Sequence, residues 1–198
     1  MKMSSAIINP LWLRVTHWVN AVAVVIMILS GWRIYNASPI FPFKFLPSLT
    51  MGGWLGGALQ WHFAAMWLLV LNGLIYLILS LSTGRFRKKL LPVSAAVFIS
   101  DARAAITGRL SHDDISEYNA VQKVAYLAII LDLIVLVLSG LVIWKSVQFP
   151  LLRTLMGGYD TARIVHFAAM SFAVVFMVVH VVMVALVPRT FVSMVRGR

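Results

Sequence analysis

The sequence has no cysteine and few charged residues, and both deficits exclude whole classes of protein. Without cysteine, the 198 residues cannot build a disulfide scaffold, a cysteine-ligated iron–sulfur cluster, a thiolate zinc site or a C-x-x-C-H haem attachment. Any metal centre must therefore use histidine, carboxylate or methionine ligands. Only 12% of the residues are charged, whereas soluble domains carry about 25%. With 61% apolar residues, the chain is expected to have the lipid bilayer as its solvent.

Four apolar stretches are long enough to cross the membrane as helices, which takes about 20 residues each. The first follows Lys2 as a signal peptide would. Its apolar run is longer than a signal peptide's usual core of about 7 to 15 residues, and no A-x-A cleavage site follows, so we interpret it as a helix. We predict an all-α integral membrane protein, a four-transmembrane-helix bundle forming one domain over residues 1–198, with helices at about 11–32, 57–81, 119–144 and 161–187.

The charge distribution predicts the orientation of the chain. Twelve of the 17 Lys and Arg residues fall near the N-terminus, between the second and third spans, or near the C-terminus. Because Lys and Arg are enriched in cytoplasmic loops, both termini are expected in the cytoplasm. The net charge of +11 is explained by this bias, so no nucleic-acid partner is expected. The other side of the membrane holds five cations, which are Arg33, Lys44, Lys145, Arg153 and Arg163.

The connections between the spans differ in character. Residues 33–56 are rich in Pro, Phe, Trp and Gly, which favours a loop lying against the outer leaflet. Ser94–Gly108 alternates apolar and charged positions, as expected of a short amphipathic helix on the inner surface. The basic run Arg85–Lys89 is interpreted as contacting lipid headgroups. Tryptophans near the predicted interfaces are interpreted first as belt residues, and they are Trp12, Trp32, Trp54 and Trp144.

A short motif occurs twice in the chain. Met51-Gly52-Gly53 precedes His62-Phe63-Ala64-Ala65-Met66, and Met156-Gly157-Gly158 precedes His166-Phe167-Ala168-Ala169-Met170. Each copy puts a histidine near the start of a span, and the two spans enter the membrane from the same side. Two explanations stand: chance similarity in an Ala-rich membrane protein, or two halves of one binding site.

Four of the five histidines lie inside the predicted spans, at two depths. His62 and His166 lie about one turn, or about 6 Å, inside the outer ends of the second and fourth spans. His17 and His180 lie about 10 Å from the cytoplasmic ends of the first and fourth. The step from His166 to His180 returns the helix to within about 40° of its starting direction, so both face one way. One buried histidine is most simply a hydrogen-bonded core residue, but four at matched depths predict two ligand pairs.

Histidine pairs at two depths favour haem over zinc. A structural zinc site needs four ligands close together, and no Cys, Asp or Glu at either depth completes such a set. Two axial imidazoles are enough for a planar iron macrocycle. Small residues could let a flat group approach the helices, although they are also common in ordinary helix packing; they are Gly31, Gly73 and Gly140. The fifth histidine, His112, is interpreted as a solvated loop residue.

Arg14 and Arg163 each precede a predicted ligand by three residues, which places both side chains on one helix face. Each lies on the membrane-surface side of its histidine, where haem carboxylates would point, so both are predicted to bind haem. The alternative is an arginine that snorkels from a helix end. Asp132 lies deep in the third span, where it could relay protons or be held neutral by a hydrogen bond to Asn72 or to the backbone.

The chain resembles the bacterial cytochrome b561 and nickel–iron hydrogenase cytochrome b superfamily over essentially its whole length. One histidine in each of the first two spans, and two in the fourth separated by fourteen residues, carry the resemblance. The segments most similar to thiosulfate-reductase-type cytochrome b subunits are His17–Asn20, Ser30–Trp32, Trp61–Phe63 and Val187–Thr190. The resemblance implies a multi-pass protein of the bacterial inner membrane with two non-covalent b haems. His62 and His166 would ligate the outer haem, and His17 and His180 the inner one.

The resemblance also implies a function in a respiratory chain. Such subunits pass electrons between the quinone pool and a periplasmic catalytic subunit, often a molybdopterin enzyme, and act as membrane anchors rather than as catalysts alone. Residues 33–56 and Lys145–Arg163 are candidate docking surfaces for that subunit. Hydrogenase-type members often have a fifth helix, which is not found here, so a hydrogenase partner is disfavoured. Two alternatives stay open: a free-standing oxidoreductase acting on a small substrate such as superoxide, and a haem-free transporter or scaffold.

Overall fold

The computed structural model describes residues 7–107 and 117–197. Its elements there are helices joined by turns and irregular segments, and the described ranges contain no strand. Lys2, Gly108 and His112, which are named in the sequence predictions, lie outside the described residues. In chain order the elements are α1 (Leu11–Ala37), the 3₁₀ helix η1 (Pro47–Leu49), α2 (Leu55–Ser82), α3 (Arg85–Leu90), α4 (Ala95–Ile106), α5 (Ala120–Trp144), α6 (Pro150–Leu155), α7 (Tyr159–Leu186) and α8 (Pro188–Arg196).

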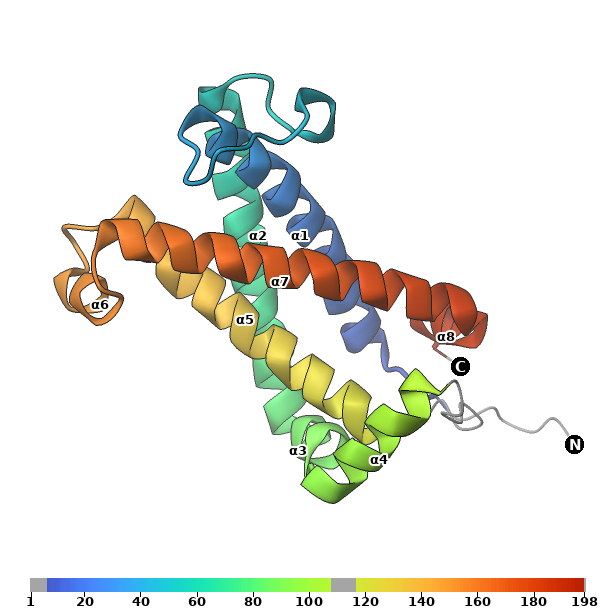
Figure 1. The fold of residues 1–198 in the computed structure, drawn as a ribbon. Helices are drawn as coiled ribbons and strands as arrows, with labels where there is room; N and C mark the ends of the chain where they lie inside the picture. Colours follow the sequence, from blue (N-terminus) through green and yellow to red (C-terminus); the bar gives the residue numbers. More distant parts are fainter. Residues whose placement is uncertain (1–6, 108–116, 198) are drawn as a thin grey trace, which may run out of the picture.

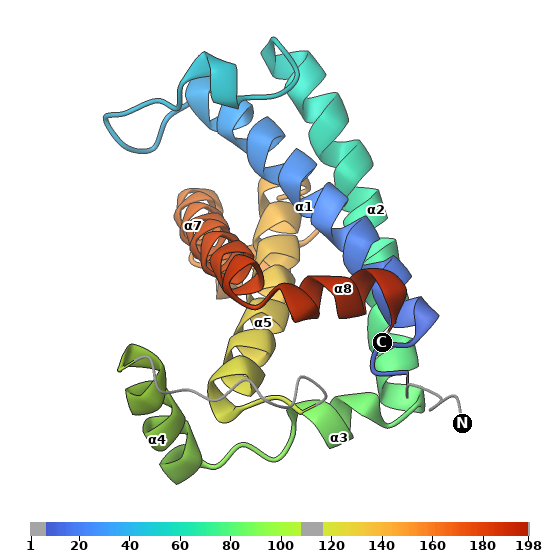
Figure 2. The ribbon, with the colours of Figure 1, turned by 90° about the vertical axis from the view of Figure 1, so that its right-hand side faces the viewer.

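Four of these helices are long and apolar enough to cross a membrane, which confirms the predicted all-α membrane fold. They form two pairs, α1 with α2 and α5 with α7 (Figures 1 and 2), and the close backbone contacts lie mostly within each pair. Side chains from different pairs must therefore reach across the middle of the molecule to meet. We call the end that carries α3, α4 and α8 the termini end, and the end formed by residues 38–54 and 145–158 the loop end.

At the loop end, three of the long helices extend beyond the limits predicted from the sequence. α1 continues five residues beyond the predicted end at residue 32, and α2 and α7 each begin two residues earlier than predicted. The apolar run in the sequence ends at Arg33, but the helix continues because its backbone hydrogen bonds do not depend on the polarity of the side chains. Tyr35, in the added turn, is buried. The start of α5 was nearly correct: Asn119 is its N-cap and forms a capping box with Gln122.

The short helices were predicted only in part. α4 confirms a helix within Ser94–Gly108, whereas α3, α6 and α8 were not predicted. α8 begins at Pro188 because proline cannot continue α7, and Gly197 ends it in the left-handed conformation. α8 packs on the start of α1. The amide of Asn9 donates to Ser193 Oγ at 3.1 Å, and the Trp18 indole donates to the Met194 carbonyl at 3.2 Å.

Small side chains occupy the closest contacts between the long helices. Ala23, Ala58, Ala162, Ser30 and Ser139 have no exposed surface, whereas many Leu, Ile and Val side chains of the same helices are exposed. This inversion of the soluble pattern is expected when lipid surrounds the helices and close backbone approach holds them together. The two serines are thus fully buried in contacts between the long helices.

Candidate functional site

His62 and His166 meet at the loop end. Each is the eighth residue of its helix, α2 for His62 and α7 for His166, so both lie at the same depth, about 10 Å inside the helix start. Their ring centroids are 6.5 Å apart and their planes cross at 63°. The two helices belong to different pairs, so the two rings meet edge-on between the pairs.

A serine from the partner helix of each pair holds each of these rings. Ser30 Oγ on α1 lies 3.0 Å from His62 Nδ1, and Ser139 Oγ on α5 lies 3.0 Å from His166 Nδ1. Each hydroxyl also donates to a carbonyl in its own helix, at 2.6 Å for Ser30 and 2.7 Å for Ser139. A hydroxyl has one proton to donate, so each serine oxygen accepts from Nδ1–H. This tautomer leaves the Nε2 lone pair of each histidine free to bind a metal.

The residue after each serine is a glycine that makes room for the ring. A Cβ added at Gly31 would lie 3.4 Å from His62 Cε1, and one added at Gly140 would lie 3.4 Å from His166 Cε1. Gly73 differs, because a Cβ there would meet nothing within 4 Å. Each copy of the repeat seen in the sequence thus includes a Ser-Gly pair on the preceding long helix, which contacts the histidine of that copy. The two copies meet in the structure through their histidines, His62 and His166.

His17 and His180 meet at the termini end. His17 is the seventh residue of α1, and His180 is the seventh from the end of α7. Their ring centroids are 6.1 Å apart with planes crossing at 61°. His180 stacks on Phe176 at 5.9 Å, and His17 packs edge-on against Trp18 at 5.3 Å. Aromatic packing rather than a serine orients these two rings.

The spacing of both pairs is compatible with one metal ion between the two rings. Two metal–nitrogen bonds of about 2 Å, with each ring centre about 1 Å beyond its nitrogen, require centroids about 6 Å apart. Nowhere in residues 7–107 and 117–197 do three or more His, Cys, Asp or Glu side chains gather as a metal site. A metal held by either pair would therefore take its other ligands from a non-protein group, as an iron macrocycle provides.

The two arginines lie where the sequence predicted, but each is attached to protein. Arg14 donates to the Val195 carbonyl of α8 at 2.6 Å, and its buried Nε has no hydrogen-bond partner among the described residues. Arg163 donates to the carbonyl and the hydroxyl of Ser38, at 2.5 and 3.2 Å. A buried, unsatisfied donor one turn from His17 fits an anionic group at this depth. For Arg163, the observed bonds tie α7 to the end of α1.

Asp132 lies two turns from Ser139 on α5, and therefore on the same helix face. Its Oδ2 atom is buried without a hydrogen-bond partner in the described part of the chain. The predicted alternative of a bond to Asn72 is wrong in this structure, because the Asn72 amide donates to the Thr16 carbonyl at 2.8 Å and to Asn20 Oδ1 at 2.6 Å. The carboxyl thus sits near the middle of a span without a neutralising contact.

Sequence reasoning missed the two serines. Ser30 was noted only within a family motif, and Ser139 was not singled out. The tripeptide Leu-Ser-Gly occurs at both places, 29–31 and 138–140, and would have pointed to them as part of the repeat. Their bonds to histidine depend on tertiary contacts, which the local pattern does not contain.

Comparison with known proteins identifies the family of the chain. A relative from Azospira oryzae, named putative protein-methionine-sulfoxide reductase subunit YedZ1, is 62% identical over 190 residues, which is 96% of each chain. No solved structure matches the chain. The family model of prokaryotic cytochrome b561 matches residues 9–197. The chain therefore belongs to the prokaryotic cytochrome b561 family, and is a multi-pass protein of the bacterial inner membrane that uses b-type haem to transfer electrons across it.

Proposed function

We propose that this chain binds two b haems, one between His62 and His166 and the other between His17 and His180. Bound haem supplies one-electron oxidation and reduction at its iron. The protein sets the ligand orientation, because Ser30 and Ser139 fix the loop-end rings and Phe176 and Trp18 pack against the termini-end rings. The observation that carries the proposal is the meeting of histidines from different helix pairs at two depths, at 6.5 and 6.1 Å.

The two pairs would place redox centres near opposite faces of the membrane. His166 and His180 are fourteen residues apart on α7, which is about 21 Å along a helix axis. The Lys and Arg bias supports an orientation with the termini end in the cytoplasm and the loop end in the periplasm. In the proposal Arg14 and Arg163 neutralise haem carboxylates at the two surfaces, and Arg14 has a free buried donor for this role.

We further propose that the chain links the quinone pool to a periplasmic catalytic subunit. The relative is named as a subunit of a putative protein-methionine-sulfoxide reductase, which supports a partner that reduces oxidised methionine. Reducing a sulfoxide to a thioether consumes two electrons and two protons and releases water, and a quinol can supply both electrons and both protons. A molybdopterin enzyme is the partner class that the family resemblance favours. Asp132, unpaired on the inward-facing side of α5, is a candidate for proton transfer during quinol oxidation.

Of the alternatives, the free-standing superoxide oxidase-like enzyme shares the two-haem arrangement. It differs in needing no protein partner for turnover. The haem-free transporter or scaffold conflicts with the family, which is one of cytochromes.

Transmembrane transfer can be tested directly in proteoliposomes that enclose ferricyanide. Dithionite added outside should reduce the enclosed ferricyanide through the protein, at a rate well above that of protein-free liposomes. His17→Ala and His62→Ala should each stop the transfer, since each removes one centre of the path. Transfer at the wild-type rate in either variant would contradict a path through both centres. Supplying quinol in place of dithionite then tests the proposed donor.

Ser30→Ala and Ser139→Ala are expected to weaken haem binding at the loop end about tenfold, at the low end of the usual effect of removing a group that orients a metal ligand. Each change leaves a histidine Nδ1–H without its acceptor and frees the ring to rotate. Haem transfer to apomyoglobin measures the loss. Ser171→Ala is the matched control, because Ser171 makes the same bond to its own helix, 2.9 Å to the Phe167 carbonyl, and makes no hydrogen bond to a histidine among the described residues. An equal loss in the control would show that the serine–histidine bonds do not matter.

A further inference from the structure

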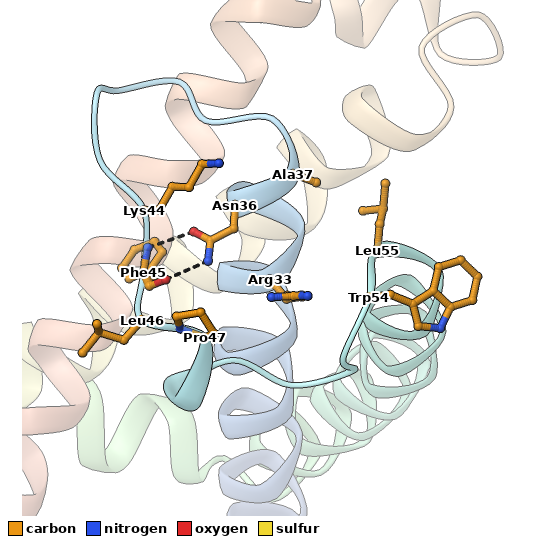
Figure 3. A pocket seen from close by; sticks show the side chains of 9 residues that line it. All are labelled: Arg33, Asn36, Ala37, Lys44, Phe45, Leu46, Pro47, Trp54 and Leu55. Atoms are coloured by element: carbon orange, nitrogen blue, oxygen red, sulfur yellow. Dashed lines mark hydrogen bonds between the residues drawn. The ribbon is translucent and has the colours of Figure 1, made fainter.

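A pocket of about 590 Å³ opens at the loop end, between the end of α1, the segment before η1 and the start of α2 (Figure 3). Arg33 and Asn36 line it from α1, Lys44 and Leu46 from the loop, and Trp54 and Leu55 from the start of α2. The pocket lies apart from the four histidines and is not used by the proposed electron path.

One asparagine builds the pocket. The Asn36 amide donates to the Phe45 carbonyl and its oxygen accepts from the Phe45 N–H, both at 2.8 Å. This pair of bonds fixes the loop against the last turn of α1, as the dashed lines in Figure 3 show. Lys44, the neighbouring residue, is thereby held over the same pocket as Arg33.

The pocket carries positive charge without protein compensation. Within the described part of the chain, neither Arg33 nor Lys44 makes a hydrogen bond or an ion pair. The sequence contains no Asp or Glu between residues 33 and 55. Two cations held at one concavity with no acidic neighbour favour an anionic ligand.

The rim of the pocket is apolar and exposed. Trp54 is 69% exposed, Leu46 66% and Leu55 44%. Trp54 and Leu55 lie at the start of the membrane-spanning helix α2, and Leu46 lies in the loop before it. Tryptophan is enriched at the membrane–water interface, where lipid headgroups lie. An exposed apolar rim around a cationic centre matches an amphiphile better than a small soluble anion.

We infer that this pocket binds an anionic phospholipid of the leaflet at the loop end, with the headgroup phosphate between Arg33 and Lys44 and the acyl chains along Leu46 and Leu55. The shared chemistry is a phosphate, which a free anion could also supply. The apolar rim and its continuity with the lipid-facing helix surface favour the lipid. The inference does not depend on the number or the ligands of the haems.

The test compares lipid binding to the intact, haem-loaded protein by native mass spectrometry. Phosphatidylglycerol and phosphatidylcholine of the same chain length are added separately. The wild type should bind one phosphatidylglycerol tightly, and the Arg33→Gln, Lys44→Gln double variant about 30-fold more weakly, since each cation near a lipid phosphate contributes about 1 kcal/mol. Lys145→Gln with Arg153→Gln is the matched control, because it removes two loop-end cations outside the pocket.

The outcome separates a specific lipid site from its rivals. Selective loss of phosphatidylglycerol in the pocket variant, with unchanged binding in the control, supports the inference. Equal weakening in both variants would overturn it, because general surface charge would then explain the attraction. Competition by millimolar inorganic phosphate would also overturn it, in favour of a soluble anion. An unchanged haem spectrum in both variants verifies that they fold.

Discussion

Replacing His62 or His166 with alanine is expected to remove one of two haems and leave the other. Each histidine provides one of the two imidazoles at the loop end, where the ring centroids are 6.5 Å apart. The termini-end pair lies about 21 Å away along α7 and uses the other two histidines. The haem-to-protein ratio, measured as the pyridine haemochrome, should therefore fall by about half in either variant.

Three further variants make this result decisive. His17→Ala should also halve the haem-to-protein ratio, but the haem that it loses should be the one whose absorption spectrum remains in His62→Ala. The double variant His17→Ala, His62→Ala should contain no haem. His112→Ala, the fifth histidine, should keep the wild-type ratio. If His62→Ala and His17→Ala removed the same spectral component while both proteins kept their helix content, the pairing by depth would be contradicted.

Gly31→Leu and Gly140→Leu are expected to displace the loop-end haem almost completely. A Cβ at either position already approaches a histidine ring carbon at 3.4 Å, so the additional atoms of leucine must push that ring out of place. Alanine should be tolerated, because 3.4 Å is at the edge of ordinary contact. The expected result is a haem-to-protein ratio near half for each leucine variant and near the wild-type value for each alanine variant.

Gly73→Leu is the matched control for these substitutions. It adds the same side chain to a glycine within a membrane-spanning helix, but a Cβ there meets nothing within 4 Å. It should therefore retain both haems. Equal haem loss from Gly73→Leu would show that leucine damages the bundle in general and that the glycines beside the rings have no special role.

The sequence was sufficient for the number and approximate position of the long helices, because a bilayer imposes a simple requirement on length and polarity. It was insufficient at the loop end, where α1 runs on past Arg33 to Ala37. It also missed α8, whose position depends on contacts with residues almost a whole chain length away, such as Asn9 with Ser193. Short helices of this kind are determined by tertiary contacts rather than by a local apolar run.

The histidine pairs could be predicted because depth in a membrane is readable from position within a span. His17, His62, His166 and His180 were grouped by counting residues from the helix ends, and the structure brings together the same pairs. Their surroundings could not be read this way. The bonds of Ser30 and Ser139 to histidine depend on the packing of α1 on α2 and of α5 on α7. The bond of Arg14 to Val195 depends on the packing of α8 on the start of α1.

Whether the chain holds one haem at each depth is decided by counting its haems. The purified wild-type protein is reduced with dithionite, and its haem content is determined against protein mass from amino-acid analysis. Two b haems per chain are expected. A ratio of one in fully loaded protein, or a colourless protein, would contradict the arrangement of His62 with His166 and His17 with His180.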